Sequence, residues 1–273
     1  MANSLLHYPV LEKKQTWGRL PGCSLSLALA EFCQQQKGIK LVIAPNNLIA
    51  NQLINEIKFF LPDTHQPLFY FPDWETLPYD LFSPHQDIIS ERLAVLSRLS
   101  HLEEGVIISS LPTLMHRLPP QSFIDQYAFL LEAGQKFNLK EFRHHLGQGG
   151  YHSVNKVLEH GEYAIRGSII DLFPMGSKLP YRIELFDDEI ESLREFDTET
   201  QRTIQKIDKI KILPAREFPL NEQSITHFRR AFREQFSGNP SNSPIYEAIS
   251  NHQCPAGIEY YLPLFFEEKA TLF

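Results

Sequence analysis

Short apolar runs alternate with helix-like patterns along the first 120 residues, and this alternation constrains the fold more than any other feature of the sequence. Continuous, β-rich apolar runs of this length are typical of buried parallel strands. Ser24 is expected to cap the first helix and Gly38 to end it. Because strand and helix alternate, we predict an α/β domain at residues 1–120, built on a parallel sheet covered by helices. Helices are expected at 24–36, 47–61 and 87–102, and strands at 39–45, 67–72 and 105–110.

The pattern changes near residue 121. Beyond it we expect a strand and glycine turn at 123–137, a short helix at 138–150, and β-like runs at 161–174, 181–186 and 190–197. The acidic link Asp187-Asp188-Glu189 joins the last two runs, and a link this short predicts an antiparallel hairpin. We assign residues 121–212 to a separate α+β module with an antiparallel sheet. Residues 213–273 turn helical again, with a helix at 223–236, and are expected to form a truncated segment.

The composition favours protein partners over nucleic acid. Lys and Arg number 26 against 33 Asp and Glu, which gives a formal net charge of −7, and no dense basic run occurs. DNA-binding domains gather basic side chains because neutralising phosphates supplies much of their affinity. No apolar run is long enough for a membrane span, and the N-terminus lacks a signal-peptide pattern. The three cysteines have no paired spacing, so we expect a cytoplasmic protein without a zinc site.

A glycine-containing turn precedes the first helix and raises the hypothesis of a nucleotide-binding loop. A working phosphate loop needs glycines whose amides close on phosphate, and a lysine that reaches the β- and γ-phosphates. With Gly22 aligned to such a loop, Ser24 takes the next glycine position and Leu25 the lysine position. Only Ser26 remains, as a hydroxyl on the magnesium side. Leucine cannot balance phosphate charge, so we interpret the segment as an ordinary capped helix and a non-functional relic.

The other candidate sites carry weaker signals. The stretch 71–87 is rich in aromatic, acidic and proline residues, as a binding loop can be. A packed surface loop anchored by Trp74, Tyr79 and Phe82 explains it as well. The acidic hairpin link is explained by its turn without a bound cation. No nucleophile and base can be paired from the sequence. Metal-ligand spacing is also lacking for the histidines His85, His144, His145 and His160.

The run 181–186 predicts a surface of a different kind. Strand side chains alternate, so Arg182, Glu184 and Phe186 point to one side, opposite the apolar set Tyr181, Ile183 and Leu185. The apolar set is expected to pack on the module's helix. The other set places an aromatic ring between charged residues on the solvent side, and arginines and aromatic rings are enriched in protein-binding hot spots. Lone apolar side chains on a surface are also common without any function.

A similar argument applies to the run 161–174. Ala164, Arg166 and Ser168 are expected to share one face, opposite Tyr163, Ile165 and Ile169. Arg166 should therefore be exposed. Whether it adjoins Arg182 is left open by the sequence.

Three blocks of the sequence carry a family resemblance. Residues 73–93 (DWETLPYDLFSPHQDIISERL), 159–177 (EHGEYAIRGSIIDLFPMGS) and 180–197 (PYRIELFDDEIESLREFD) are similar to the N-terminal region of the bacterial transcription-repair coupling factors. More distantly, they resemble UvrB, the damage-verifying protein of bacterial excision repair. The resemblance extends over most of residues 15–270, and the block at 159–197 is the most specific.

The resemblance implies an architecture and a partner. In the family, a degenerate helicase-like domain (1A) carries an inserted UvrA-binding domain (2) and continues into a return segment (1B). By motif match, the arginines of the AIRG and PYRIELF motifs are Arg166 and Arg182, and Glu184 and Phe186 lie on the same implied surface. The longer parent is expected to be an ATP-dependent DNA translocase that also binds RNA polymerase and DNA. One of its C-terminal domains can mask the UvrA surface.

Two departures from UvrB weigh against the rival functions. UvrB has a working phosphate loop, whereas this chain has Leu25 at the lysine position. UvrB also inserts a DNA-clamping β-hairpin, whereas Tyr79-Asp80 here runs directly into the helix at 87–102. A nucleotide hydrolase and a damaged-DNA binder are therefore the alternatives to the UvrA-binding adaptor that we predict. We expect a monomer with no catalysis, cofactor or metal in this fragment and no membrane partner.

Overall fold

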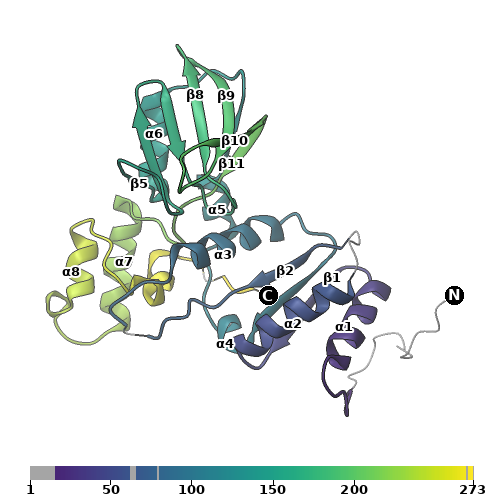
Figure 1. The fold of residues 1–273 in the computed structure, drawn as a ribbon. Coiled ribbons are helices and arrows are strands. Elements are labelled where there is room, and N and C mark those ends of the chain that lie inside the picture. The colour runs from purple at the N-terminus through teal and green to yellow at the C-terminus, as the bar shows by residue number, and fades with distance from the viewer. Residues whose placement is uncertain (1–15, 62–65, 79, 269, 273) are drawn as a thin grey trace. The chain divides into compact units, whose positions relative to one another are not determined.

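The computed structural model describes residues 16–61, 66–78, 80–268 and 270–272. The chain divides into two compact units. One unit consists of Met1–Asp73 and His101–Met115, and the other of Trp74–Ser100 and His116–Phe273. Both units mix helices with strands, and the predicted combination of a parallel and an antiparallel sheet in an α/β protein is confirmed (Figure 1).

The first unit is built on a three-stranded sheet in the order β1-β3-β2, and both strand pairs are parallel, as predicted. Residues of α2 and the sheet form its core, in which Ala50, Leu53 and Ile57 pack with Val106 and Ile108. The elements are the strands β1 (Ile39–Ala44), β2 (Leu68–Phe71) and β3 (Gly105–Ser110) and the helices α1 (Ser24–Gln35), α2 (Asn47–Phe60) and α4 (Leu111–Leu114).

Two local expectations for this unit are wrong. Cys23 occupies the N-cap position of α1, and the Ser24 hydroxyl instead donates a hydrogen bond to the carbonyl oxygen of Pro21. Strand β1 is only partly buried, because Ile39 and Ile43 are each 50% exposed. A true side-chain cap occurs on α2, where the Asn46 side chain accepts a hydrogen bond from the Ile49 amide.

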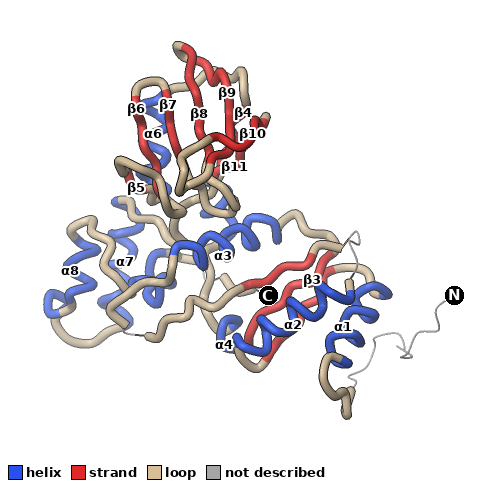
Figure 2. The backbone as a smooth tube through the Cα atoms, viewed as in Figure 1, coloured by secondary structure: helices blue, strands red, loops and turns tan. Residues whose placement is uncertain are grey.

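The second unit contains a six-stranded sheet in the order β10-β9-β8-β7-β6-β5 (Figure 2). The neighbours from β6 to β10 are antiparallel, and β5 is parallel to β6. The predicted hairpin of β8 and β9 is confirmed. A separate antiparallel pair joins β4 and β11. The strands are β4 (Phe129–Glu132), β5 (His152–Ser153), β6 (Glu162–Arg166), β7 (Ile169–Leu172), β8 (Tyr181–Phe186), β9 (Glu189–Phe196), β10 (Thr203–Ile207) and β11 (Lys209–Ile212).

The run 161–174 forms two strands instead of one. The chain turns at Gly167, which has a φ of +62°, and at Ser168. β6 and β7 are therefore an antiparallel pair, in which Ile169 lies opposite Arg166. The expectation that Ile169 lies on the opposite face from Arg166 is wrong for this reason, because cross-strand partners share a face.

The helices of the second unit follow the predicted pattern, with one exception. Residues at the start of the segment 123–137 belong to a helix, α5, and only its later part is strand β4. None of the helices in the described part of the chain has the length and apolar composition that a membrane crossing requires. The helices are α3 (Gln86–Leu99), α5 (Gln121–Tyr127), α6 (Leu139–Gly149), α7 (Glu222–Gln235) and α8 (Pro244–Ser250), with 3-10 turns η1 (Pro240–Asn242) and η2 (Ile258–Phe265).

Helix α6, which precedes the six-stranded sheet, is bounded by strong local signals. The Asn138 side chain caps its first turn by accepting from the amides of Lys140 and Glu141. Its C-cap is Gly150, with a φ of +93°. The positive φ favours glycine here, and a Cβ would come within 2.2 Å of Arg216 Nε, so the Arg216 side chain would have to move to admit one.

A buried ion pair ties α3 to the segment that follows β11. Arg92 Nε donates to Glu217 Oε1 at 2.8 Å, and both side chains are fully buried. Trp74 Nε1 donates to the second oxygen of Glu217 at 2.8 Å. Trp74 is thus the buried anchor that the sequence predicted, whereas Phe82 is 58% exposed and is not an anchor. Tyr79, the third predicted anchor, lies outside the described residues.

Candidate protein-interaction face of the six-stranded sheet

The strand register places the candidate residues on one side of the six-stranded sheet. Arg182 lies between Asp171 and Arg194, and Glu184 lies between Ile169 and Ser192. Residues in register on neighbouring strands point to the same side. We call this surface the arginine face and define it by Arg166, Ile169, Asp171, Arg182, Glu184, Phe186, Ser192 and Arg194.

The opposite side of the sheet is apolar. Ile170, Ile183 and Leu193 are in register across β7, β8 and β9, and all three are completely buried. The predicted alternation along β8 is therefore confirmed, with Ile183 in the core and Phe186 74% exposed.

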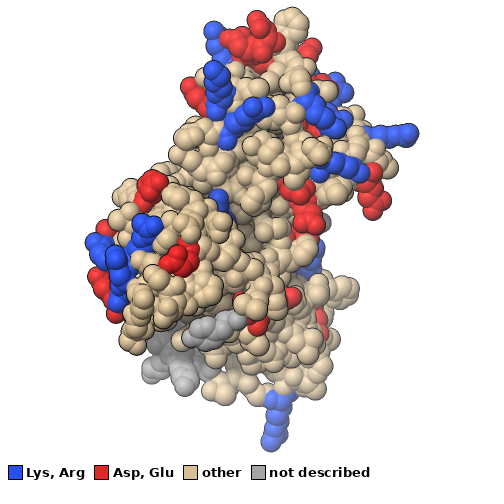
Figure 3. Space-filling model, turned by 90° about the vertical axis from the view of Figure 1, so that its left-hand side faces the viewer, with Lys and Arg blue, Asp and Glu red and all other residues tan. Residues whose placement is uncertain are grey.

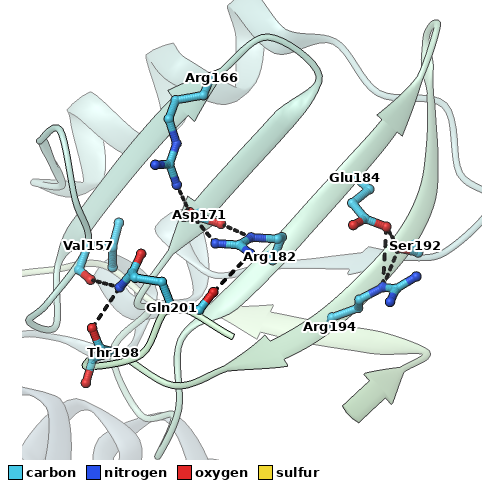
Figure 4. Close-up of polar contacts among 9 residues, drawn as sticks. All are labelled: Val157, Arg166, Asp171, Arg182, Glu184, Ser192, Arg194, Thr198 and Gln201. Atoms are coloured by element: carbon cyan, nitrogen blue, oxygen red, sulfur yellow. Dashed lines mark hydrogen bonds and ion pairs between the residues drawn. The ribbon is translucent and has the colours of Figure 1, made fainter. Parts of the chain in front are cut away.

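One carboxylate joins two arginines at the centre of the arginine face (Figure 4). Arg182 Nε donates to Asp171 Oδ1 at 2.7 Å, and Arg182 Nη2 donates to Oδ2 at 2.9 Å. Arg166 Nη2 donates to the same Oδ2. The Asp171 side chain is fully buried, and Asp171 thus links the two arginines whose adjacency the sequence left open.

The exposed fractions of the two arginine side chains differ. The Arg166 side chain is 53% exposed, as predicted. The Arg182 side chain is only 16% exposed, so the expectation that it stands in solvent is wrong. Its guanidinium lies 4.9 Å from the ring centroid of Phe196, and its Nη1 donates to the Gln201 carbonyl at 3.3 Å. The hydrogen bond to Asp171 raises the pKa of Arg182 above its usual value.

A second polar group lies beside this pair on the same face. Arg194 Nε lies 3.3 Å from Glu184 Oε2, and the Ser192 hydroxyl donates to the same oxygen (Figure 4). The side chains of Arg194 and Glu184 are 42% and 31% exposed. Glu184 therefore offers a partly exposed carboxylate whose charge is already partnered.

Asp171 and Arg194 were not predicted from the sequence as members of this face. The signal for Asp171 is its position, a single acid within an apolar run that forms β7 and continues to Phe173. A carboxylate in such a strand needs a cationic partner because burying an unpaired charge is very costly. Arg194 alternates with Ser192 along β9, but the cross-strand register is needed to place it beside Arg182.

The loop before α1 contains the residues that the sequence compared with a phosphate loop. Gly22 retains a positive φ of 56°, and Ser24 and Leu25 begin the helix. Ser26 is buried, and its hydroxyl donates to Glu56 Oε2 of α2. This bond, followed by one from Gln52, holds the pKa of Glu56 below its usual value. The Ser26 hydroxyl, which the sequence assigned to the magnesium side of such a loop, is thus part of the contact between α1 and α2.

Other charged groups form ordinary surface and packing contacts. His160 lies between Asp87 Oδ1 at 2.7 Å and the Ser177 carbonyl at 2.9 Å. No group of three or more His, Cys, Asp or Glu side chains suited to a metal ion occurs within the described ranges. In the view of Figure 3, basic side chains are interspersed with acidic ones.

Comparison with known proteins first defines the class of the module. Residues 129–218 match the family model of the UvrB interaction domain. This range contains every residue of the arginine face.

The whole chain is also similar to transcription-repair-coupling factors. It is 45% identical over 251 residues to that of Escherichia coli (strain K12), with 92% of this chain and 22% of the relative covered. The identity is 44% over 256 residues for Haemophilus influenzae (strain Rd), covering 93% of this chain and 22% of the relative. For Rickettsia bellii (strain RML369-C) the identity is 32% over 242 residues, covering 88% of this chain and 21% of the relative. The chain spans about a fifth of the length of these curated relatives. It carries a UvrB interaction domain within a region related to the coupling factors, and the family predicted from its sequence is confirmed.

Proposed function

We propose that this region is a docking module that binds UvrA through the arginine face. The UvrB interaction domain match at residues 129–218 is the observation that carries the proposal, since Arg166, Arg182, Glu184 and Phe186 all lie within it. Arg166 and Phe186 are the most accessible members of the face: the Arg166 side chain is 53% exposed and Phe186 is 74% exposed. An exposed arginine and an exposed aromatic ring on one face are a typical composition of a binding hot spot.

The proposed role belongs to a longer protein. In that protein, which also binds RNA polymerase and DNA and acts as an ATP-dependent translocase in the cytoplasm, this region recruits UvrA to a polymerase stalled at damage. The relatives named as transcription-repair-coupling factors support this role. The three segments would be a helicase-like domain at 1–120, the UvrA-binding domain at 121–212 and a return segment at 213–273.

We assign no nucleotide chemistry, cofactor or metal to this region. Support comes from the loop before α1, where Leu25 stands at the lysine position and the Ser26 hydroxyl is bonded to Glu56. The helicase-like fold with a degenerate phosphate loop is part of the same proposal.

Isothermal titration calorimetry with purified UvrA tests the proposed function. The parent chain should bind in a saturable manner, and Arg166→Ala should weaken that binding. Arg230→Ala is a matched control, because the Arg230 side chain is 58% exposed and lies on α7, outside the matched domain. Folded parent chain that shows no saturable binding to UvrA would contradict the proposal.

A further inference from the structure

Asp171 is a completely buried carboxylate at the centre of the arginine face, next to the exposed Arg166. Both of its oxygens accept hydrogen bonds from guanidinium groups, two from Arg182 and one from Arg166. A buried carboxylate persists when its charge is paired and its oxygens are hydrogen-bonded. Because the backbone of β7 fixes Asp171 in the sheet, its carboxylate also fixes where the two guanidinium groups lie.

The two arginines use their hydrogen-bond donors differently. Arg182 directs three nitrogens at protein oxygens, two at Asp171 and one at the Gln201 carbonyl. Arg166 makes its one hydrogen bond within the described residues through Nη2, and its side chain is 53% exposed. A guanidinium has five N–H donors. Most of the donors of Arg166 therefore remain available to a ligand outside the protein.

The charges of the cluster also single out Arg166 as the group that faces a ligand. Two guanidinium groups and one carboxylate leave a net charge of +1, and the exposed member of the cluster is Arg166. An arginine held in a fixed orientation recognises a carboxylate through two parallel hydrogen bonds. We infer that Asp171 is a positioning residue that orients Arg166 toward an acidic side chain of the partner, with Arg182 holding Asp171 in place. This inference rests on the proposed function and adds the chemistry of recognition to it.

A double-mutant cycle tests the inference by calorimetry with purified UvrA. Asp171→Asn keeps the shape of the side chain but removes its charge. In the parent chain it should weaken UvrA binding about tenfold, which is within the range of coupling energies between contacting residues. In the Arg166→Ala background the same substitution should change the affinity less than about twofold, because the group that Asp171 positions is gone. Asp208→Asn, which removes the same charge from an exposed site between β10 and β11, should leave the affinity unchanged.

Equal losses from Asp171→Asn in both backgrounds would overturn the inference, since a purely structural carboxylate acts regardless of Arg166. If Asp171→Asn melts below the assay temperature, Asp171→Glu replaces it in the same cycle, because it keeps the charge but moves the carboxylate by one methylene. A loss confined to the Arg166-containing background again supports the inference, and equal losses again refute it. Failure of the parent chain to bind UvrA would instead contradict the proposed function.

Discussion

Protein groups surround the Arg182 side chain on several sides, whereas the Arg166 side chain extends into solvent. Arg182 meets Asp171, the Gln201 carbonyl and the ring of Phe196. Truncating each arginine therefore measures a different quantity. Loss of Arg182 leaves the buried Asp171 with one partner, and loss of Arg166 leaves the Asp171–Arg182 pair intact.

Arg182→Ala should lower the free energy of unfolding by up to about 3–5 kcal/mol, as expected when one partner of a buried pair is removed. Arg166→Ala should change stability little but weaken UvrA binding by about 2 kcal/mol, or roughly thirtyfold. Urea unfolding and calorimetry of both variants separate the two effects. An Arg182→Ala variant as stable as the parent would contradict the buried role of this side chain.

Phe186 and Ile183 offer a second contrast on one strand. Phe186 is 74% exposed and Ile183 is fully buried. Phe186→Ala should weaken UvrA binding by about 2 kcal/mol without loss of stability. Ile183→Ala should destabilise the fold by roughly 2–5 kcal/mol. Phe59→Ala, at an 82% exposed position on α2, is the matched control and should bind UvrA like the parent. A stable Ile183→Ala variant would mean that the two faces of β8 are exchanged.

At the scale of elements, local sequence signals defined most helices and strands but not every boundary. The helix expected at 138–150 is α6, which runs from Leu139 to Gly149 between Asn138 and Gly150. The run 161–174 was predicted as one strand because its apolar pattern continues through Gly167 and Ser168. The Gly167-Ser168 pair is itself a local hairpin signal that the strand expectation passed over, and β6 and β7 pair across it. Helix α5 was read as a strand because its aromatic and β-branched residues suit both structures.

A buried tyrosine, Tyr151, links the end of α6 to the segment after β11 and gives a pH-dependent prediction. The Tyr151 hydroxyl, just after α6, donates to the Leu213 carbonyl at 2.6 Å and accepts from the Met175 amide at 3.4 Å. Burial raises the pKa of Tyr151. The pKa of Tyr151 is therefore higher in the folded state than in the unfolded state. The stabilising contribution of the neutral Tyr151 hydroxyl is complete below about pH 10 and is lost as the pH rises further.

Tyr151→Phe should therefore lower the free energy of unfolding at pH 7 by about 1–3 kcal/mol, because the Leu213 carbonyl loses its donor. Above about pH 10 the stability of the variant should fall less steeply than that of the parent. Chemical unfolding between pH 7 and 11 measures both effects. Tyr163→Phe, a half-buried tyrosine in β6, corrects for general alkaline effects. Parallel pH profiles for Tyr151→Phe and the parent would refute the assignment.

At the scale of the whole chain, the arginine face and the loop compared with a phosphate loop belong to different units. The arginine face lies in the unit that contains residues 116–273, and the loop before α1 lies in the unit that contains residues 1–73. Mg-ATP should not raise the melting temperature, because a ligand stabilises only a state that it binds. Thermal melts with and without Mg-ATP check this. A clear upward shift that disappears in Ser26→Ala would reinstate a nucleotide site.

The net charge of −7 leads to a prediction about DNA. Binding to duplex DNA should be weak, independent of sequence and no tighter for damaged duplex, because phosphate contacts require a concentrated positive charge. Gel-shift titrations at physiological salt with intact and lesion-bearing duplex provide the measurement. Tight, lesion-selective binding would favour the damaged-DNA alternative instead.

The amino-acid sequence by itself determined the periodic and local features of this protein. Alternation in β8 placed Ile183 in the core and Phe186 in solvent, and capping residues bounded α6. These properties depend on neighbours within a few residues, which the sequence displays directly. The family motifs also predicted the relationship to the coupling factors that the comparisons confirmed.

Only the tertiary structure decided which charged side chains are buried and with what partners. Arg92 and Glu217 are separated by 125 positions in the chain, and the two ends of the ion pair carry no local sign of each other. Arg182 is mostly shielded from solvent because Phe196 and Gln201 lie beside it, at the end of β9 and in the loop after it. The cost of burying a charge depends on every group around it, and those groups are brought together by the fold rather than by the order of residues.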